Sequence, residues 1–434
     1  MNSQSIYRYL LLMLLFSAAH DILFVYFNNP SGLSLNKVFF IVSFCLFFKL
    51  ISVKNYINCT DGKSKIAVLF FFFYCLVTFV RGLSVGLAEG RLQNALNPVL
   101  SLCVIVPFAF FISFNHDFTF KKLLKVLLLF NKIGVALLPV MFVVNRGYVI
   151  PRPFIEASFF LFIFLSCFES KKERTWILAG FIGYLIVGIY SDNRSIVLRG
   201  ALQVVFLLIF NYGEKLISRK VIKLAITAGC LALPIAFFTY YESFFQSSTI
   251  AVGSKSISNE DTRTFLYMDV LQELQSNDQI WTGKSTLGRY YSDLFFRQMG
   301  VDDAVDFYDR SIVEVGQLSY MLRGGAVLVI LFTLLSLVSA LTNLSSTDYF
   351  ARASSYIILN HLLVSFIENI PKYHVYDILV WILIGYNISS RFSKASKQKQ
   401  KHPVVQDEIV ASPNPLSYAP HYQIQHRHGQ LQRG

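Results

Sequence analysis

The sequence predicts an all-α, polytopic integral membrane protein with about 12 transmembrane helices and one large loop outside the cytoplasm. Hydrophobic residues make up 54% of the 434 residues and charged residues only 15%, whereas about a quarter of a soluble domain is charged. The apolar residues also form continuous blocks, such as 66–80 and 324–341. Continuous blocks favour helices, which satisfy their own backbone in lipid, over the alternating strands of a β-barrel.

The apolar blocks divide into twelve predicted spans. They lie near residues 9–27, 36–53, 66–83, 98–114, 123–144, 154–168, 176–190, 196–210, 221–238, 316–341, 353–367 and 375–388. Several hold only about 15 residues, or about 22 Å of helix, and need flanking residues to complete a crossing. The first span has the length of a retained helix and lacks the small-residue cleavage site of a signal peptide.

Lysine residues assign the two sides of the membrane. Lysine clusters, such as those around Lys121 and Lys171, recur in every second connection, and positive charge favours the cytoplasmic side. Both termini are therefore predicted to be cytoplasmic. The basic residues lie in short loops rather than on one soluble face, which argues against a nucleic-acid partner despite the net charge of +13.

The chain divides into four predicted parts. These are transmembrane helices 1–9 in 1–239, the large loop in 240–314, helices 10–12 in 315–390 and a disordered cytoplasmic tail in 391–434. The loop is net negative, with twelve acidic and six basic residues. Ser258 with Asp261 resembles a capping box, which predicts an amphipathic helix that continues through about Gln275.

The loop offers neither a nucleotide site nor a metal site. Gly283, Lys284 and Ser285 imitate the end of a phosphate-binding loop, but Asp278 stands where that motif needs glycine. Gly283 and Gly288 are therefore predicted to form turns. The loop has no cysteine and no Asp-x-Asp pair that could hold a divalent ion. No metal and no cofactor are predicted.

Arginine is enriched on the outer side. The residues assigned there include four lysines and eleven arginines: Arg81, Arg91, Arg146, Arg152, Arg194, Arg199, Arg263, Arg289, Arg297, Arg310 and Arg323. Charge alone does not require arginine, whereas its planar guanidinium binds phosphate or carboxylate through paired hydrogen bonds. The bias predicts an anionic ligand at the outer face. The alternative is that these side chains reach lipid headgroups.

Ionisable residues inside the predicted spans also fall on the outer side. Examples are Glu156, Arg199 with Gln203 one turn later, and Arg323 beside Gly324 and Gly325, where backbone can approach closely. Lys132 and His361 are the main exceptions, and His361 is interpreted as a contact between helices. A transport path would distribute such groups through the full depth. The pattern therefore favours chemistry or binding at the outer interface.

Four short motifs resemble the O-antigen polymerase and ligase superfamily. They are Tyr190-Ser-Asp-Asn-Arg-Ser-Ile-Val-Leu-Arg-Gly-Ala, Asp261-Thr-Arg-Thr-Phe-Leu, Ile280-Trp-Thr-Gly, and the re-entry from Glu314 to Leu322-Arg-Gly-Gly-Ala. The resemblance covers about 190–330. Ligases of this superfamily usually carry a histidine about eleven residues before the re-entry glycine. This chain has Asp309-Arg-Ser-Ile-Val-Glu there, which favours the polymerase branch and makes Glu314 the substitute candidate.

The resemblance implies a membrane glycosyltransferase of the bacterial inner membrane with a large periplasmic loop. It would polymerise oligosaccharide repeat units carried on undecaprenyl diphosphate, as in O-antigen, capsule or exopolysaccharide synthesis, without a metal ion. Flippase and chain-length regulator proteins would be its partners, alongside membrane lipid. The alternatives are ligase-type transfer of glycan to a lipid or protein acceptor, and a flippase or exporter of the lipid-linked glycan.

The expected site combines a base with arginines for the diphosphate. Glu314, Arg194 and Arg263 are the catalytic candidates. Glu314 would accept the proton of the acceptor hydroxyl, although it could instead only pair with Arg310 four residues earlier. Arg199, Arg323 and Arg289 are expected to bind the diphosphate, whose developing charge needs preorganised stabilisation.

Overall fold

The structure is a computed structural model, in which part of the chain is described. The described residues are 15, 62–88, 109–110, 113, 120–145, 152–190, 194–213, 218–229, 232, 250–252, 255–257, 264–292, 309–310, 313–346, 348–367 and 375–389. The predicted spans near 9–27, 36–53 and 98–114, and the tail 391–434, therefore lie wholly or mostly outside the described residues.

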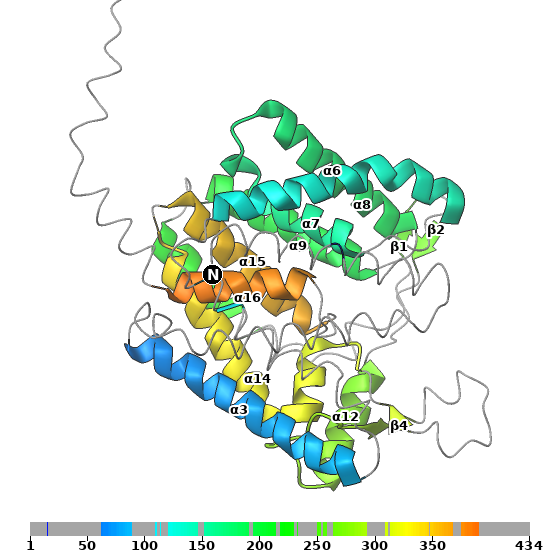
Figure 1. The fold of residues 1–434 in the computed structure, drawn as a ribbon, viewed down its shortest axis with the longest axis vertical. Coiled ribbons are helices and arrows are strands. Elements are labelled where there is room, and N and C mark those ends of the chain that lie inside the picture. The colour runs from blue at the N-terminus through cyan, green and yellow to red at the C-terminus, as the bar shows by residue number, and fades with distance from the viewer. Residues whose placement is uncertain are drawn as a thin grey trace, which may run out of the picture. The chain divides into compact units, whose positions relative to one another are not determined.

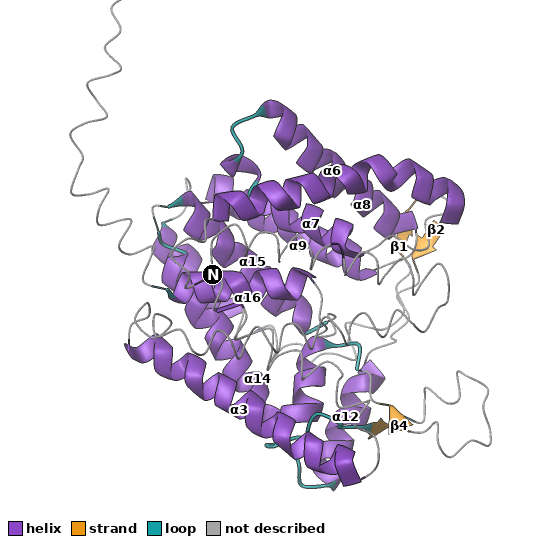
Figure 2. Cartoon of the chain, viewed as in Figure 1, coloured by secondary structure: helices purple, strands orange, loops and turns teal. Residues whose placement is uncertain are grey.

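Helices dominate the described residues (Figures 1 and 2). The helices are α3 (Gly62–Ala88), α6 (Phe120–Asn145), α7 (Arg152–Ile163), η2 (Leu165–Cys167), α8 (Lys171–Tyr190), α9 (Arg194–Leu208), η3 (Ile209–Gly213), α12 (Thr264–Ser276), α14 (Gly316–Asn343), α15 (Tyr349–Ser365) and α16 (Val375–Ile388). The structure also contains two short antiparallel strand pairs that the sequence did not predict. They are β1 (Ile250–Val252) with β2 (Lys255–Ile257), and β3 (Tyr290–Tyr291) with β4 (Asp309–Arg310).

Among the described residues, four helices are long and apolar enough to cross a membrane, judged by length and composition. They contain the stretches Ile66–Val85, Phe120–Val140, Ile196–Gly213 and Gly316–Asn343. On α3 the exposed apolar residues recur every three or four positions, as Ile66, Leu69, Phe73, Val77 and Val80 do. Such a stripe would be unfavourable in water and is expected of a face in contact with lipid. The helical membrane fold is thus supported, and the count of twelve spans stays a prediction.

Aromatic contacts bring several helix termini together at one end of the bundle, which we call the lysine end. Phe120 at the start of α6 lies 4.5 Å, between ring centroids, from Phe350 at the start of α15. Phe350 also stacks at 4.6 Å on Phe164, just after α7. The exposed Lys121 and Lys122 directly follow Phe120 in the first turn of α6, and the exposed Lys171 and Lys172 begin α8.

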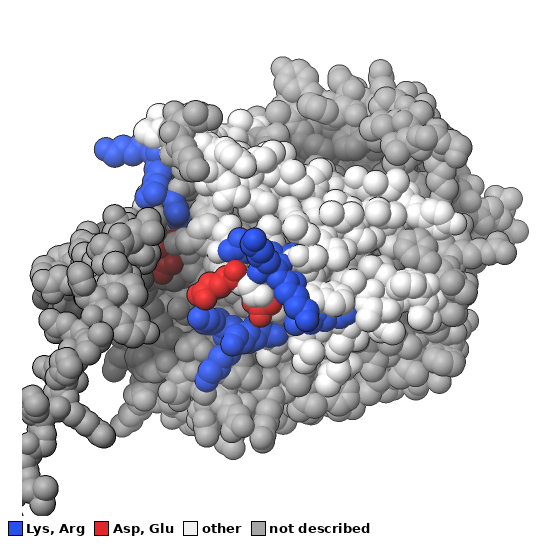
Figure 3. Space-filling view, turned by 90° about the horizontal axis from the view of Figure 1, so that it is seen from above, with Lys and Arg blue, Asp and Glu red and all other residues white. Residues whose placement is uncertain are grey.

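Contacts near the other termini of the same helices define a second end, which we call the loop end. The Tyr376 backbone N–H in the first turn of α16 donates to Glu156 Oε2 in the first turn of α7 (3.2 Å). The guanidinium carbon of Arg199 in α9 lies 4.6 Å from the centre of the Tyr376 ring. Consecutive helices of the sequence, such as α6 and α7 or α15 and α16, therefore run in opposite directions, whereas the packed helices α7 and α16 run in the same direction. In the space-filling view of Figure 3, charged side chains gather near the centre and at the upper left, and the rest of the described surface in this view is uncharged.

The helix α14 is broken at Gly325, which has φ 65° and ψ −169°, a conformation essentially restricted to glycine. The ring centroids of Tyr320 and Phe332 are 4.7 Å apart, although twelve residues of straight helix would separate them by about 18 Å. The chain therefore turns back at Gly325, and Figure 1 draws α14 as two segments at an angle. The sequence predicted one continuous span over 316–341. The structure instead has a short segment, 316–324, and a long segment, 326–343.

The short segment belongs to a small separate core at the loop end. Leu318 and Leu322 pack with apolar residues of α12 and of the strand β3, among them Leu266, Val270 and Tyr290. The helix α12 ends at Ser276, close to the predicted end near Gln275. The predicted capping residues Ser258 and Asp261 lie outside the described residues. This core gives the described part of the large loop a fixed attachment to the bundle.

Candidate functional site

A tight turn of the large loop, residues 280–286, inserts its backbone into the break in α14. The backbone N–H groups of Lys284 and Ser285 donate to the carbonyls of Leu322 (2.7 Å) and Arg323 (2.9 Å). In return, the N–H of Ala326 donates to the carbonyl of Ile280 (2.8 Å). These bonds satisfy the backbone groups that the interrupted helix cannot pair internally. We call this element the docked turn.

Two glycines make this close approach possible. A Cβ atom on Gly283 would lie 2.5 Å from the Arg323 carbonyl carbon, and one on Gly325 would lie 2.2 Å from the Trp281 carbonyl. Both residues also have positive φ, 64° and 65°. The predicted turn at Gly283 is therefore confirmed, as is the predicted close approach of backbone at the pair Gly324 and Gly325.

Helix α3 holds the docked turn from the side. The Tyr74 hydroxyl donates to the Gly324 carbonyl (2.7 Å), and Arg81 donates to the carbonyls of Thr282 (2.9 Å) and Gly283 (3.0 Å). The Thr286 hydroxyl donates to the carbonyl of Thr78 (3.1 Å). The two terminal nitrogens of the Arg81 guanidinium therefore bind the loop backbone and not an anionic ligand.

The docked turn lies beside the apolar part of α3, since Tyr74 and Thr78 both fall within the stretch Ile66–Val85. Irregular backbone at membrane depth is tolerated only where it is buried in protein or lines a polar cavity. The hydrogen bonds to α3 and α14 meet this requirement. We therefore interpret the docked turn and the short segment of α14 as a re-entrant element.

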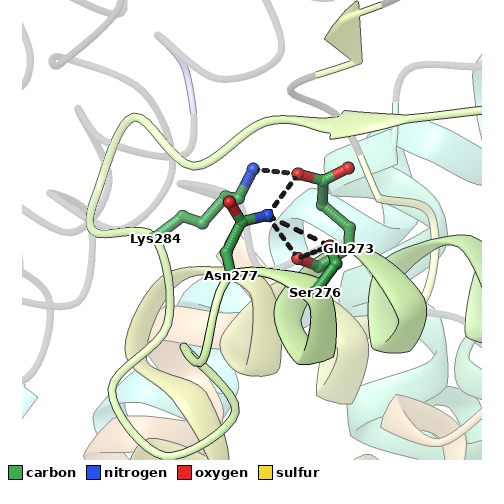
Figure 4. Close-up of polar contacts among 4 residues, drawn as sticks. All are labelled: Glu273, Ser276, Asn277 and Lys284. Carbon is green, nitrogen blue, oxygen red and sulfur yellow. Dashed lines mark hydrogen bonds and ion pairs between the residues drawn. The ribbon is translucent and has the colours of Figure 1, made fainter.

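The backbone of Gly283-Lys284-Ser285 does not have the geometry of a phosphate-binding loop. The N–H groups of Gly283, Lys284 and Ser285 all donate to protein carbonyls, whereas a phosphate loop directs such groups at its ligand. Lys284 forms an ion pair with Glu273 of α12, and Asn277 also donates to Glu273 (3.0 Å; Figure 4). These contacts agree with the prediction from the sequence that the large loop has no nucleotide site.

Arg323, a predicted diphosphate ligand, is buried at the end of the short segment of α14. Only 3% of it is exposed, and its Nη1 donates to the Ser319 carbonyl (3.1 Å) and to the Ser319 hydroxyl. Tyr320, one turn earlier, lies close enough to interact electrostatically with both Arg323 and Asp377 of α16. Arg323 thus faces the interior of the bundle and not the lipid.

Arg199, another predicted diphosphate ligand, is half-buried where α9, α15 and α16 meet. Its guanidinium lies over the Tyr376 ring, an arrangement that stabilises a cation by interaction with the aromatic face. Its backbone carbonyl accepts a hydrogen bond from the Asn360 amide of α15 (3.4 Å). Glu156 and Asp377 both interact electrostatically with the same Tyr376. Two carboxylates therefore share this region with the guanidinium.

His361 and Asp377 form the ionisable pair that the sequence interpretation missed. His361 Nδ1 lies 3.8 Å from Asp377 Oδ1, and both residues are buried. The imidazole ring packs 5.8 Å from the Tyr376 ring and 6.1 Å from the Phe332 ring, between centroids. His361 was interpreted only as a contact between helices. Asp377 was not singled out, although an acidic residue inside an apolar span is itself a signal of function.

We call Glu156, Arg199, Arg323, His361 and Asp377 the loop-end cluster. Among the described residues, the buried Asp, Glu, His and Arg residues are Glu156, Arg323, His361 and Asp377. At the lysine end, the buried polar contacts involve uncharged groups, such as the bond from Asn343 to the Asn387 carbonyl (3.1 Å). Lys132 of α6 is half-buried. The burial of charge is therefore concentrated at the loop end.

The remaining predicted site residues belong to the large loop or have side chains that the structure does not describe. Glu314 is half-buried between Val313 and Val315, which belong to the small loop core. Arg289 is half-buried next to Tyr290 of the same core. Arg194 begins α9, but its side chain is not described, and Arg263 lies outside the described residues. Of the predicted site residues, Arg199 and Arg323 are the two that the structure places near buried acidic residues, and their convergence on one ligand stays a prediction.

Within the described ranges, no group of three or more His, Cys, Asp or Glu side chains is placed to hold a metal ion. Comparisons with protein-family models, with curated proteins and with solved structures find no match. The functional argument therefore depends on the residues and their arrangement.

Proposed function

We propose that this chain is a membrane glycosyltransferase that polymerises oligosaccharide repeat units carried on a polyprenyl diphosphate. The observation that carries the proposal is the gathering of Arg199 and Arg323 with buried acid–base groups at the loop end. Transport of the lipid-linked glycan would favour charges distributed through the depth of the bundle. Chemistry at one interface favours charges gathered at that interface.

The reaction needs stabilisation of a leaving diphosphate and removal of one proton. The acceptor hydroxyl attacks the anomeric carbon, the bond from that carbon to the diphosphate oxygen breaks, and the diphosphate leaves with the electron pair. Guanidinium groups preorganised near the leaving oxygen would stabilise its charge. We assign this role to Arg199 and Arg323, with Arg194, Arg263 and Arg289 as further diphosphate ligands, and we propose that no metal ion is required.

The proton of the acceptor hydroxyl has two candidate bases. Glu314 is the candidate from the sequence, at the start of the short segment of α14. His361 is the second candidate, because it lies in the same cluster as Arg199 and its Nδ1 is 3.8 Å from Asp377 Oδ1. A carboxylate that moves within hydrogen-bond distance of one imidazole nitrogen would orient the ring and favour the other nitrogen as a base.

The proposed setting is the bacterial inner membrane. We propose twelve spans, both termini in the cytoplasm, and the docked turn on the periplasmic side, where undecaprenyl-diphosphate-linked repeats would reach the loop end. The lysine end would then face the cytoplasm, in agreement with the positive-inside rule. Flippase and chain-length regulator proteins are the expected partners.

Deletion of the gene, followed by electrophoresis of the cell's glycans, tests this function. We expect single repeat units on the final acceptor, and polymer restored by the wild-type gene. Bare acceptor together with accumulated lipid-linked polymer would instead indicate the ligase alternative. Accumulation of single lipid-linked repeats only on the cytoplasmic leaflet would indicate a flippase or exporter. Unchanged glycan would refute all three.

The two candidate bases can be separated by Glu314→Gln and His361→Gln. Loss of a general base typically lowers turnover by about 100-fold or more, so the substitution at the true base should reduce polymer synthesis by that factor. The other substitution should have an effect of less than about tenfold. Initial rates of polymer formation by purified full-length variants, normalised to folded protein, measure this. If neither variant loses more than tenfold, both assignments are wrong.

A further inference from the structure

Several buried polar atoms beside the loop-end cluster lack a protein partner. Neither amide atom of Gln203 in α9 has a hydrogen-bond partner among the described residues, and the same holds for Asn360 Oδ1 and the Tyr376 hydroxyl. Gln203 and Asn360 are completely buried, and Tyr376 is 1% exposed. The Gln203 amide lies next to the Tyr376 hydroxyl, but the two groups do not meet the distance and angle limits of a hydrogen bond.

These atoms belong to one place. Gln203 is one helical turn after Arg199, whose guanidinium covers the Tyr376 ring and whose carbonyl accepts a bond from Asn360. The groups therefore meet between α9, α15 and α16. Buried donors and acceptors without partners are costly, and native proteins normally pair them with protein, water or ligand.

The chemistry of these groups indicates the class of ligand. Two amides and a phenol offer both donors and acceptors without net charge, as the hydroxyl groups of a sugar require. An uncharged ligand also avoids repulsion by the carboxylates of Glu156 and Asp377, which lie near Tyr376. We propose that Gln203, Asn360 and Tyr376 form a subsite for the acceptor sugar, an inference that rests on the proposed polymerase function.

The subsite also places the acceptor relative to the two candidate bases. Asn360 directly precedes His361, and the imidazole and Tyr376 rings are 5.8 Å apart, between centroids. A hydroxyl held by Asn360 and Tyr376 would therefore lie beside His361. The subsite thus favours His361 over Glu314 as the group that receives the proton.

Gln203→Leu tests the subsite by separating ligand binding from stability. Leucine has a similar volume, and no protein hydrogen bond is lost among the described residues, so the melting temperature should be retained or raised. The dissociation constant for the acceptor should weaken by about fivefold to tenfold, the usual value of one or two neutral hydrogen bonds. Tyr376→Phe, which removes only the hydroxyl, should weaken binding in the same direction.

Asn343→Leu is the matched control, because this buried amide at the lysine end does bond, to the Asn387 carbonyl. It should lower the melting temperature and leave the dissociation constant unchanged. The probe is the free oligosaccharide repeat, released by mild acid from the lipid-linked repeat of a strain that lacks this protein. Its dissociation constant is measured by titration of the melting temperature of the full-length protein in lipid nanodiscs.

The same preparations are assayed for polymer formation from the intact lipid-linked repeat. If wild type polymerises the repeat but Gln203→Leu and Tyr376→Phe bind the oligosaccharide as wild type does, the subsite is refuted and the function stands. A wild type that polymerises but whose melting temperature does not respond to oligosaccharide also refutes the subsite, and indicates bound water at these atoms. If wild type makes no polymer, the proposed function itself is refuted.

Discussion

Replacement of Gly325 by alanine is expected to abolish accumulation of the folded protein. The backbone at Gly325 has φ 65° and ψ −169°, and a residue with a side chain pays about 1–3 kcal/mol to adopt such a conformation. The new Cβ atom would also lie 2.2 Å from the Trp281 carbonyl carbon and oxygen. Relief of this clash requires separation of the docked turn from α14, which would break the backbone hydrogen bonds between them.

The comparison variant is Gly229→Ala, since a Cβ atom there meets nothing within 4 Å. It should accumulate as wild type does and gain up to about 1 kcal/mol from better helix propensity. Size-exclusion chromatography of detergent extracts, with a fluorescent fusion partner, measures folded protein for both variants. A Gly325→Ala protein that elutes as a folded species with a wild-type melting temperature would show that α14 is not broken there.

Replacement of Arg199 by methionine is expected to reduce polymer synthesis by about 100-fold to 1000-fold, the usual cost of removing one preorganised group that stabilises developing negative charge. Methionine retains the length and apolar character of the side chain, so folded protein should persist. Arg199→Lys retains the charge but loses the planar fork, and should recover only part of the rate. Initial rates with purified lipid-linked repeat measure both effects.

Arg352→Met is the matched control for this experiment. Arg352 is also half-buried, with its guanidinium 5.1 Å from the centre of the Phe210 ring, but it lies at the lysine end. Replacement of Arg352 by methionine should lower stability by about as much as Arg199→Met does. It should leave the rate per folded molecule within about threefold of wild type. Equal losses of rate in the two variants would mean that Arg199 serves stability alone.

Features set by local composition could be predicted from the sequence. The apolar blocks predicted helices long enough for a membrane, four of which lie within the described residues. Glycine at 283 and the pair at 324 and 325 predicted a turn and a close approach, because few other residues adopt such backbone. The end of α12 followed from its amphipathic pattern.

Features that depend on tertiary contacts could not be predicted from the sequence. Glu156 and Tyr376 are 220 residues apart in sequence, and helical periodicity assigns a residue to a face without naming what that face meets. The pairing of His361 with Asp377 was missed for this reason. The reversal at Gly325 was also missed, because residues 316–323 can extend the apolar block 324–341 into one long predicted span.

The contact of α3 with the docked turn has a consequence for the biogenesis of the protein. Tyr74 and Gly324 are separated by 250 residues, which a ribosome needs about 12–50 s to synthesise. Throughout that interval the newly inserted α3 holds Arg81 and Tyr74 without the carbonyls that later bind them. A late stage of assembly is therefore the arrival of residues 280–325 at a helix inserted long before, and a chain interrupted earlier leaves that helix without its partner.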